Sequence, residues 1–226
     1  MTEVVALIPA GGRGTRVGSR TPKQFLALDG GPILVATVGH FTRHPSVGAI
    51  VVAAPAAHVD RARHALRGLG RRSAVTIVAG GQTRQESVWL ALQAAPEQIA
   101  LVVVHDAVRP FITRTLIDAV VGAAREAGAA ICGLPVAETV KRVRGDEVEA
   151  TIDRAGLWTV QTPQAFVAEL LREAHEKARR DGVVGTDDAT LVERLGHRVK
   201  VVRGLEGNLK ITTVADLRRA RRMARR

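Results

Sequence analysis

The sequence lacks the segments and residues that are typical of membrane and secreted proteins. Its 226 residues include no apolar run as long as the roughly eighteen residues of a transmembrane helix. The single cysteine, Cys132, allows no internal disulfide, which is typical of a reducing cytoplasm. The first residues lead directly into a predicted strand, without the basic and apolar regions of a secretory signal. We therefore expect one soluble, cytoplasmic domain that spans residues 1–226 and has no membrane partner.

Aromatic residues are also scarce. The chain has no Tyr, four Phe and two Trp, too few to predict a platform on which single-stranded nucleic acid stacks. The net charge is nevertheless +11, which is compatible with nucleic acid, an anionic surface or a phosphorylated small molecule. Only five of the 33 basic residues are Lys, so a compositional bias towards Arg explains much of the excess. The charge alone does not identify a partner.

The C-terminal stretch VADLRRARRMARR has the pattern of an amphipathic helix. Val214, Leu217, Ala220 and Met223 share one stripe, and six arginines lie elsewhere on the helix. A solvated surface helix is the ordinary interpretation of this pattern. A basic nucleic-acid-binding protein that uses this helix is the alternative, although we expect no specific nucleic acid partner.

Short β-branched runs alternate with helical patterns over the first 134 residues. We expect strands at 4–8, 49–53, 75–78, 101–105 and 129–134, and helices at 33–41, 59–69, 84–95 and 113–128. The strands are largely continuous apolar runs, as in a sheet that is buried on both faces. Because β-α-β units connect parallel strands, the pattern predicts an α/β fold: a Rossmann-like, mostly parallel sheet with flanking helices.

The pattern changes after Pro135. Residues at about 137–155 alternate with period two around Gly145 and Asp146, which predicts a β-hairpin arm that protrudes from the sheet. We then expect a helix from about Gln164, a second from about Asp187, a strand at 199–202 and a terminal helix from Val214. No repeat or linker divides the chain.

A glycine-rich segment follows the first predicted strand, in the stretch ALIPAGGRGTRVGSRTPKQF. It lacks the third glycine of the dinucleotide fingerprint and the Gly-Lys-Ser/Thr ending of a P-loop. Glycines let backbone N–H groups approach phosphate oxygens, while Arg16 and Lys23 supply a planar and a compact cation. The segment therefore favours an anion with several phosphates, although a glycine-rich turn with two solvated cations remains an alternative.

Six motifs extend this interpretation along almost the whole chain. They comprise PAGGxGxR at 9–16 with PKQ at 22–24, VHDAVRP at 104–110, DRxGLW at 153–158, TPQ at 162–164, TDD at 186–188 and NLK at 208–210. Together and in this order, they resemble the 2-C-methyl-D-erythritol 4-phosphate cytidylyltransferases of the non-mevalonate isoprenoid pathway. This resemblance implies transfer of CMP from CTP to the acceptor, giving 4-diphosphocytidyl-2-C-methyl-D-erythritol and pyrophosphate. Another polyol phosphate, such as ribitol 5-phosphate, is the alternative acceptor.

The implied nucleophile is a phosphate oxygen that is already ionised at neutral pH. It needs alignment and charge neutralisation more than a general base. The resemblance implies that this neutralisation comes from three catalytic cations, Arg16, Lys23 and Lys210.

The resemblance also implies a nucleotide site with a divalent cation, Mg²⁺ or another, at Asp106. The implied nucleotide-binding residues are Pro9, Ala10, Gly11, Gly12, Gly14, Gly80, Gly81, Arg84, Ser87, Asp106 and Ala107. Asp106 ends a predicted strand, where open α/β sheets place ligands, and a single carboxylate suffices for Mg²⁺. Two alternatives stay open: Asp106 pairs only with Arg109, and Ser87 is an ordinary first-turn residue. Gln82 stands where some relatives carry an acidic residue, and Gly11 replaces a common alanine.

The acceptor site implied by the resemblance combines the sheet with the arm. Its residues would be Arg109, Thr139, Arg154, Thr162, Thr186 and Asp187, with Lys210 nearby. The resemblance implies a homodimer in which the arm is a dimerisation arm and Arg154 enters the partner's site. The alternative is an arm that only supports dimerisation, with Arg154 paired to Asp153.

Overall fold

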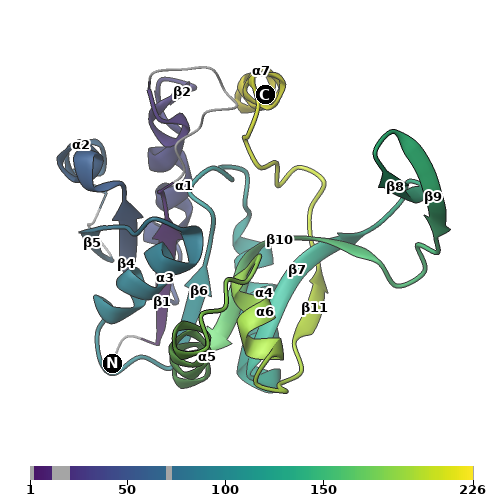
Figure 1. The fold of residues 1–226 in the computed structure, drawn as a ribbon. Helices are drawn as coiled ribbons and strands as arrows, with labels where there is room; N and C mark the ends of the chain where they lie inside the picture. Colours follow the sequence, from purple (N-terminus) through teal and green to yellow (C-terminus); the bar gives the residue numbers. More distant parts are fainter. Residues whose placement is uncertain (1–2, 12–20, 70–72, 226) are drawn as a thin grey trace.

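A seven-stranded sheet forms the centre of the protein. In this computed structural model, residues 3–11, 21–69 and 73–225 are described. The strand order is β11-β7-β10-β6-β1-β4-β5, and β10 alone runs antiparallel to its neighbours (Figure 1). The strands are β1 (Val4–Pro9), β4 (Val47–Ala54), β5 (Ala74–Ala79), β6 (Leu101–Val104), β7 (Ala129–Pro135), β10 (Trp158–Val167) and β11 (Lys200–Arg203). The predicted α/β fold with a mostly parallel sheet is confirmed.

Helices cover both faces of this sheet. The helices are α1 (Ile33–Thr42), α2 (Val59–Ala65), α3 (Arg84–Gln93), α4 (Arg114–Ala127), α5 (Ala168–Arg180) and α6 (Asp188–Glu193), with a 3₁₀ turn, η3, at Ala56–His58. Along β1, Ala6 and Ile8 join a core with α1 and α4, whereas Val5 and Leu7 join a second core with α3 and α5. Because side chains of a strand alternate between faces, burial on both sides requires the continuous apolar run of the sequence.

The helix predicted from about Gln164 is present but begins four residues later, and the strand that precedes it was not predicted. Residues Trp158–Val167 form β10, in the interior of the sheet, and α5 begins only at Ala168. Gln164 lies opposite Val104 on one side and Ile131 on the other. Pro163 is accommodated because the register shifts between Gln161 and Gln164, and a bulge of this kind is one of the few places where a sheet admits proline. The start of the helix was misplaced because Pro163 interrupts the sequence pattern of the strand.

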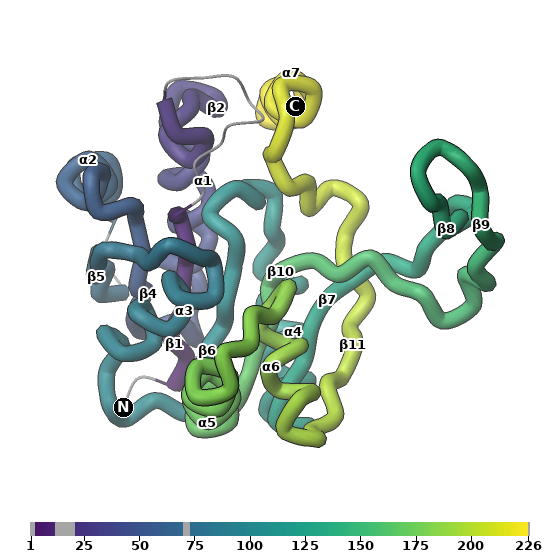
Figure 2. Tube along the Cα trace, in the orientation of Figure 1, coloured from purple at the N-terminus to yellow at the C-terminus, as the bar shows by residue number. Residues whose placement is uncertain are grey.

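The predicted hairpin arm is present. Strands β8 (Val140–Arg144) and β9 (Glu147–Ile152) pair antiparallel and extend away from the sheet (Figures 1 and 2). The turn contains Gly145 with φ +64°, a left-handed conformation that glycine adopts without strain. Val143 and Val148 are exposed on the arm. The arm therefore presents apolar side chains to whatever lies beside it.

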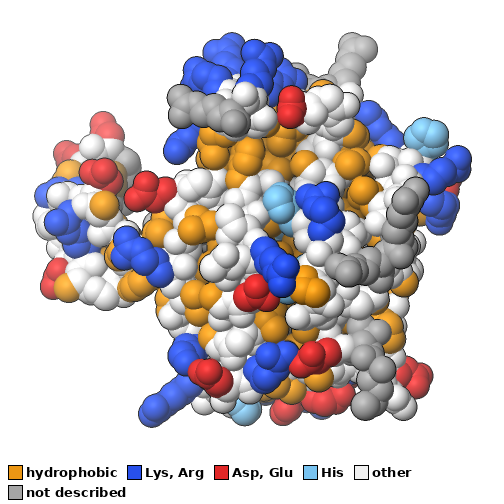
Figure 3. Space-filling model, turned by 180° about the vertical axis from the view of Figure 1, so that it is seen from behind, with side chains coloured by type: hydrophobic (Ala, Val, Ile, Leu, Met, Phe, Trp, Pro, Cys, Tyr) orange, Lys and Arg blue, Asp and Glu red, His pale blue; other side chains and the backbone are white. Residues whose placement is uncertain are grey.

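The terminal helix α7 (Val214–Ala224) has the predicted amphipathic pattern. Leu217 and Ala220 are buried in a small core that adjoins the β2–β3 hairpin (Ala27–Leu28 and Gly31–Pro32). The described arginines from 218 to 225 are exposed, and Lys and Arg side chains gather at the top of Figure 3, where α7 lies. Among the described residues, no helix combines the length and the apolar character needed to cross a bilayer.

Candidate active site

Two cavities adjoin at the carboxyl ends of the central strands. The first encloses about 490 Å³ and the second about 430 Å³. Three charged residues, Arg84, Asp106 and Lys210, line both cavities. Ligands of open α/β sheets bind at this edge, so the shared residues mark the point where two ligands in these cavities would meet.

Most of the predicted nucleotide-binding and catalytic residues that are described line the first cavity. These are Pro9, Ala10, Gly11, Lys23, Gly80, Gly81, Arg84, Asp106, Ala107 and Lys210. They come from segments that are distant in sequence and that the sheet brings together. The predicted residues Gly12, Gly14 and Arg16 lie outside the described residues.

Backbone hydrogen bonds fix the turns on either side of the first cavity. Ala10 donates its N–H to Ala53 at 2.8 Å, and Gly80 donates to Ala54 at 2.7 Å. A Cβ atom on Gly80 would lie 2.8 Å from the hydroxyl of Ser87, so the close approach requires glycine. These turns follow β1 and β5 and present their backbone to the cavity.

Ser87 supports the cavity from behind and is not among the residues that line it. Its hydroxyl donates to the Thr83 carbonyl at 2.9 Å and accepts the N–H of Gly81 at 3.2 Å. Ser87 is buried, in the first turn of α3. The structure thus favours the first-turn alternative, with the addition that Ser87 positions Gly81.

Gln24 is a supporting residue that the sequence analysis missed. Lys23 lies in the 3₁₀ turn η2 (Lys23–Phe25) and lines the first cavity. The neighbouring Gln24 is buried, and its side-chain amide donates to the Ala10 carbonyl at 2.6 Å. This bond ties the segment that carries Lys23 to the end of β1. The motif contained Gln24, but no pattern in the sequence distinguished its role from that of a solvated side chain.

The carboxylate of Asp106 lies at the centre of the shared cluster. It accepts Nε of Arg84 at 3.1 Å and Nζ of Lys210 at 2.8 Å. Arg109 lies farther away, with Nε at 3.6 Å. Burial opposes ionisation of Asp106, but Arg84 and Lys210 outweigh it and hold the pKa of that carboxyl well below its usual range. Asp106 is therefore ionised, and its surroundings extend beyond the simple pair with Arg109.

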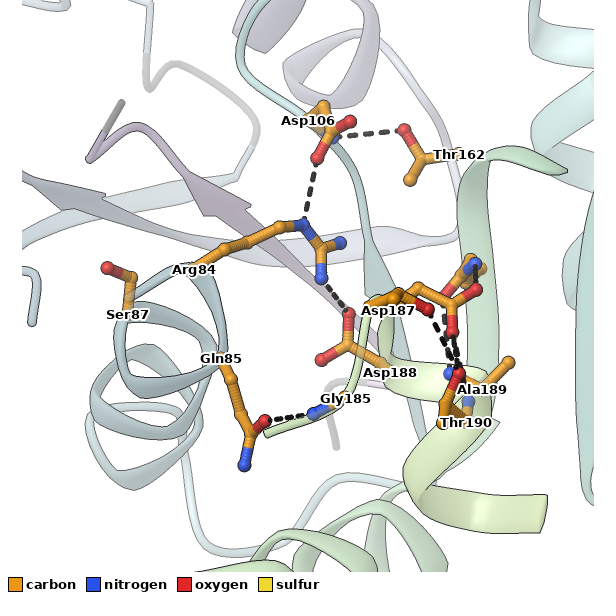
Figure 4. A network of polar contacts seen from close by, with 12 residues as sticks. Arg84, Gln85, Ser87, Asp106, Thr162, Gly185, Asp187, Asp188, Ala189 and Thr190 are labelled. Atoms are coloured by element: carbon orange, nitrogen blue, oxygen red, sulfur yellow. Dashed lines mark hydrogen bonds and ion pairs between the residues drawn. The ribbon is translucent and has the colours of Figure 1, made fainter. Parts of the chain in front are cut away.

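A second buried carboxylate, Asp188, fixes Arg84 from the other side. Arg84 Nη1 lies 2.7 Å from Asp188 Oδ2, and His175 Nε2 lies 3.1 Å from Asp188 Oδ1. Figure 4 shows Arg84 between Asp106 and Asp188. Burial alone would raise the pKa of Asp188. Arg84 and the hydrogen bond from His175 have a larger, opposite effect, so the pKa lies below its ordinary value. The sequence analysis missed Asp188, because only Asp187 of the same motif was assigned a role.

Replacement of Asp188 by Asn should cost about 2 kcal/mol of unfolding free energy at pH 7, because a buried charged hydrogen bond to Arg84 is lost. The folded pKa of Asp188 is lowered, so the difference from wild type is fully present above the unfolded pKa near 3.9. It decreases as the pH falls through the folded pKa. Urea titrations at several pH values measure it.

Asp181→Asn is the matched control for Asp188→Asn. Asp181 forms surface pairs with Lys177 and Arg194, and such pairs contribute less than about 1 kcal/mol. Equal losses of unfolding free energy in Asp188→Asn and Asp181→Asn would contradict the conclusion that Asp188 stabilises the fold through its buried bond to Arg84.

Hydrogen bonds also fix the loop that carries Asp106. The N–H of Asp106 donates to the Thr162 hydroxyl at 3.0 Å, so that hydroxyl can donate its own proton to Nδ1 of His105, 3.1 Å away. Nε2 of His105 then donates to the Arg109 carbonyl at 3.0 Å. Burial lowers the pKa of His105 to about 4, so its ring is neutral at pH 7. A neutral ring is the form that these three hydrogen bonds require.

The predicted acceptor residues outside the arm line the second cavity. They are Arg109, Thr162, Thr186 and Asp187, together with Lys210. Arg109 is fixed by a hydrogen bond from Nη1 to the Asn208 carbonyl at 2.8 Å. Asp187 caps α6 by accepting the N–H of Thr190 at 3.0 Å, and its second oxygen accepts the Gln164 amide at 2.7 Å.

The two predicted acceptor residues of the arm are not brought into this cavity within one chain. Thr139 and Arg154 are exposed and line neither cavity. Arg154 donates a hydrogen bond to the Ala137 carbonyl. No ion pair joins Arg154 to Asp153 among the described residues, and Asp153 instead accepts the N–H of Ala155 at 2.9 Å. The described cavities therefore contain no contribution from the arm of their own chain.

Comparison with known proteins gives a consistent result. A sequence model of the family described as 2-C-methyl-D-erythritol 4-phosphate cytidylyltransferase matches residues 4–226. Proteins of that name from Symbiobacterium thermophilum and Syntrophus aciditrophicus are 48% and 42% identical. These matches cover 96% and 95% of this chain, and 91% and 93% of the relatives.

Solved structures agree with the sequence relatives. The crystal structure of 2-C-methyl-D-erythritol 4-phosphate cytidylyltransferase from Thermus thermophilus is 38% identical, with a TM-score of 0.83 over 98% of both chains. The structure of 4-diphosphocytidyl-2C-methyl-D-erythritol synthase from Anaerococcus prevotii is 29% identical, with a TM-score of 0.87 over 100% of this chain and 99% of that one. The overall fold is thus similar to that of these enzymes.

Proposed function

The chain belongs to the 2-C-methyl-D-erythritol 4-phosphate cytidylyltransferase family, and from that premise we propose that its first cavity binds CTP and its second binds the acceptor. The enzyme transfers CMP from CTP to 2-C-methyl-D-erythritol 4-phosphate and releases pyrophosphate. The observation that carries the proposal is the set of charged residues common to both cavities, Arg84, Asp106 and Lys210. Bond formation between two bound phosphates requires such a meeting point.

The first cavity suits a nucleotide because its walls are largely backbone. Ala10 and Gly11 follow β1, and Gly80 and Gly81 follow β5. We assign the base and ribose to these turns, where backbone groups and small residues allow close approach. The triphosphate then extends towards Lys23 and the shared cluster, where cations offset its charge.

In the reaction, an oxygen of the acceptor phosphate forms a new bond to the α-phosphorus of CTP. The bond from that phosphorus to the bridging oxygen breaks, and its electron pair leaves with pyrophosphate. Lys23 and Lys210, with Arg16 from the glycine-rich segment, are assigned to the charge that develops on the α-phosphate and the leaving group. No side chain needs to remove a proton, since the attacking phosphate is already ionised.

Asp106 is the proposed ligand of Mg²⁺ or another divalent cation. Its carboxylate is ionised and lies where the two cavities join, and Mg²⁺ commonly binds one or two carboxylates while retaining waters and phosphate oxygens. The residues present therefore fit the ion. When bound, the ion would neutralise phosphate charge. Arg84 would stay fixed by Asp188 if Asp106 turned to the metal.

An assay with several acceptors tests the proposal. With CTP and Mg²⁺, we expect pyrophosphate release with 2-C-methyl-D-erythritol 4-phosphate at a far higher kcat/KM than with ribitol 5-phosphate. EDTA should abolish the release and added Mg²⁺ should restore it. A preference for ribitol 5-phosphate would reject the acceptor assignment, and full activity in EDTA would reject the metal. RNA or DNA binding that survives physiological salt with sequence preference would instead favour the basic α7 alternative.

The arm is assigned to a homodimer. Thr139 and Arg154 line neither cavity of their own chain. The exposed apolar side chains of Val143 and Val148 are suited to a contact with a second protein chain. A second chain would let Arg154 contact the acceptor phosphate.

The cytoplasm is the proposed compartment. The single Cys132 is buried, and burial raises the pKa of its thiol to about 12. The thiol is therefore unreactive and forms no disulfide within the chain, which is compatible with a reducing compartment.

A further inference from the structure

The second cavity has one aliphatic wall, and we propose that this wall, formed by Ile131 and Val160, selects acceptors that carry a methyl branch. The inference rests on the proposed function, in which this cavity holds the acceptor. The acceptor of the family is a polyol phosphate with one methyl group on its second carbon. A site that recognises it must distinguish this methyl group from the hydrogen of an unbranched polyol.

Strand register places the two side chains on one face of the sheet. Ile131 of β7 lies opposite Gln164 of β10, and Gly133 lies opposite Val160. Because paired residues share a face and alternate residues of a strand return to it, these four positions face the same side. Gly133 lies between Ile131 and Val160 and has no side chain. A Cβ atom there would lie 2.9 Å from the Thr159 carbonyl oxygen, so the close approach of the two strands requires glycine at this position.

The rest of the cavity is polar. Apart from Ile131 and Val160, its described lining residues are all charged or carry a hydroxyl or amide group. Gln164, beside Ile131, is itself held by Asp187 at 2.7 Å. Such groups hydrogen-bond the hydroxyls and phosphate of a polyol phosphate, but a methyl group placed against them would desolvate them without compensation. The aliphatic wall is therefore the part of the described lining that suits a methyl group.

The exposure of the two side chains supports the same assignment. Both side chains line the cavity; Val160 is 43% exposed, whereas Ile131 is largely buried, with 7% of its surface exposed. Val160 therefore supplies most of the accessible apolar surface of the wall. A methyl group that contacts this surface removes apolar area from water. Discrimination of a single methyl or methylene group by an apolar pocket amounts to roughly tenfold or more in kcat/KM.

Two conservative substitutions test the wall, with one matched control. Val160→Thr replaces a methyl group by a hydroxyl at nearly constant volume, and Ile131→Val removes one methylene without adding a polar atom. The control is Val201→Thr: Val201 lies opposite Ile131 on β11, is 46% exposed and does not line the cavity. For each protein, kcat/KM is measured with 2-C-methyl-D-erythritol 4-phosphate and with the unbranched D-erythritol 4-phosphate, and KM is measured for CTP.

We expect wild type to prefer the branched acceptor by roughly tenfold or more. Val160→Thr and Ile131→Val should each lower this ratio by about threefold or more, through loss of activity with the branched acceptor, while the KM for CTP and the control ratio stay unchanged. Circular dichroism and urea unfolding establish that each variant is folded.

Equal losses with both acceptors, or an unchanged ratio in both variants, would overturn the inference. A wild-type enzyme without activity on the branched acceptor would instead reject the proposed function. The two failures are therefore distinguishable. Because Val160 is exposed, its substitution gives a folded protein even if a change at the buried Ile131 does not.

Discussion

Lys23→Ala should lower kcat by about 10²- to 10³-fold, by analogy with the loss of one donor from an oxyanion site. Lys23 lines the first cavity, and its segment is fixed to the end of β1 by the bond from Gln24 to Ala10. A cation held there acts on charge that grows as pyrophosphate leaves, so its loss affects the transition state more than CTP binding. Single-turnover and steady-state rates with saturating CTP measure the effect.

Arg16→Ala should give a loss of similar size, although Arg16 lies outside the described residues. Lys200→Ala is the control, because Lys200 pairs with Glu126 on the surface at 2.8 Å and lines neither cavity. Lys23→Arg keeps the charge but changes its shape, and partial activity in this variant would indicate that charge provides much of the effect. Turnover near wild type in both Lys23→Ala and Arg16→Ala would restore the alternative of a glycine-rich turn with solvated cations.

The parallel part of the sheet was predictable because its strands obey one simple rule. Residues Val4–Pro9 are buried on both faces, so every position is apolar and the run is visible without any partner. The bounds of α4 were also predicted closely, at 113–128 against Arg114–Ala127 in the structure. The Thr113 side chain accepts the N–H of Leu116, as is typical of a residue that begins a helix. Gly128 has φ +84°, as is typical of a glycine that ends one.

β10 was not predictable by the same rule. Its sequence combines exposed residues near Trp158 with a buried segment from Thr162, and Pro163 breaks the pattern between them. Only the pairing with β6 and β7 makes this stretch a strand. Such pairing is a tertiary effect, which local propensity does not contain.

The site was predictable where residues meet ligands and less so where residues support each other. Asp106 and Lys210 belong to recognisable motifs, and the structure brings their side chains to 2.8 Å. Asp188 contacts Arg84 and is itself contacted by His175. These two residues position Arg84 but line neither cavity. Their roles depend on contacts between residues far apart in sequence, which a motif does not encode.

Two separately inactive variants should recover activity when they are combined in one dimer. If Arg154 contacts the acceptor across a homodimer, Arg154→Ala should impair use of the acceptor and leave CTP binding nearly unchanged, because the first cavity contains no residue of the arm. Lys23→Ala impairs the other half of the same site. In a heterodimer of the two variants, one site combines an intact arm with an intact Lys23, while the other site has lost both.

Purified heterodimers, isolated with two different affinity tags, should therefore regain about half of the wild-type activity per dimer, because one of two equivalent sites is intact. Each variant alone, assayed at the same concentration, is the control, and an Arg154→Ala/Lys23→Ala double variant paired with wild type should retain no intact site. If heterodimers form but remain inactive, Arg154 does not act across the interface. An active pairing of the double variant with wild type would point to the same conclusion, because it requires each arm to serve its own chain.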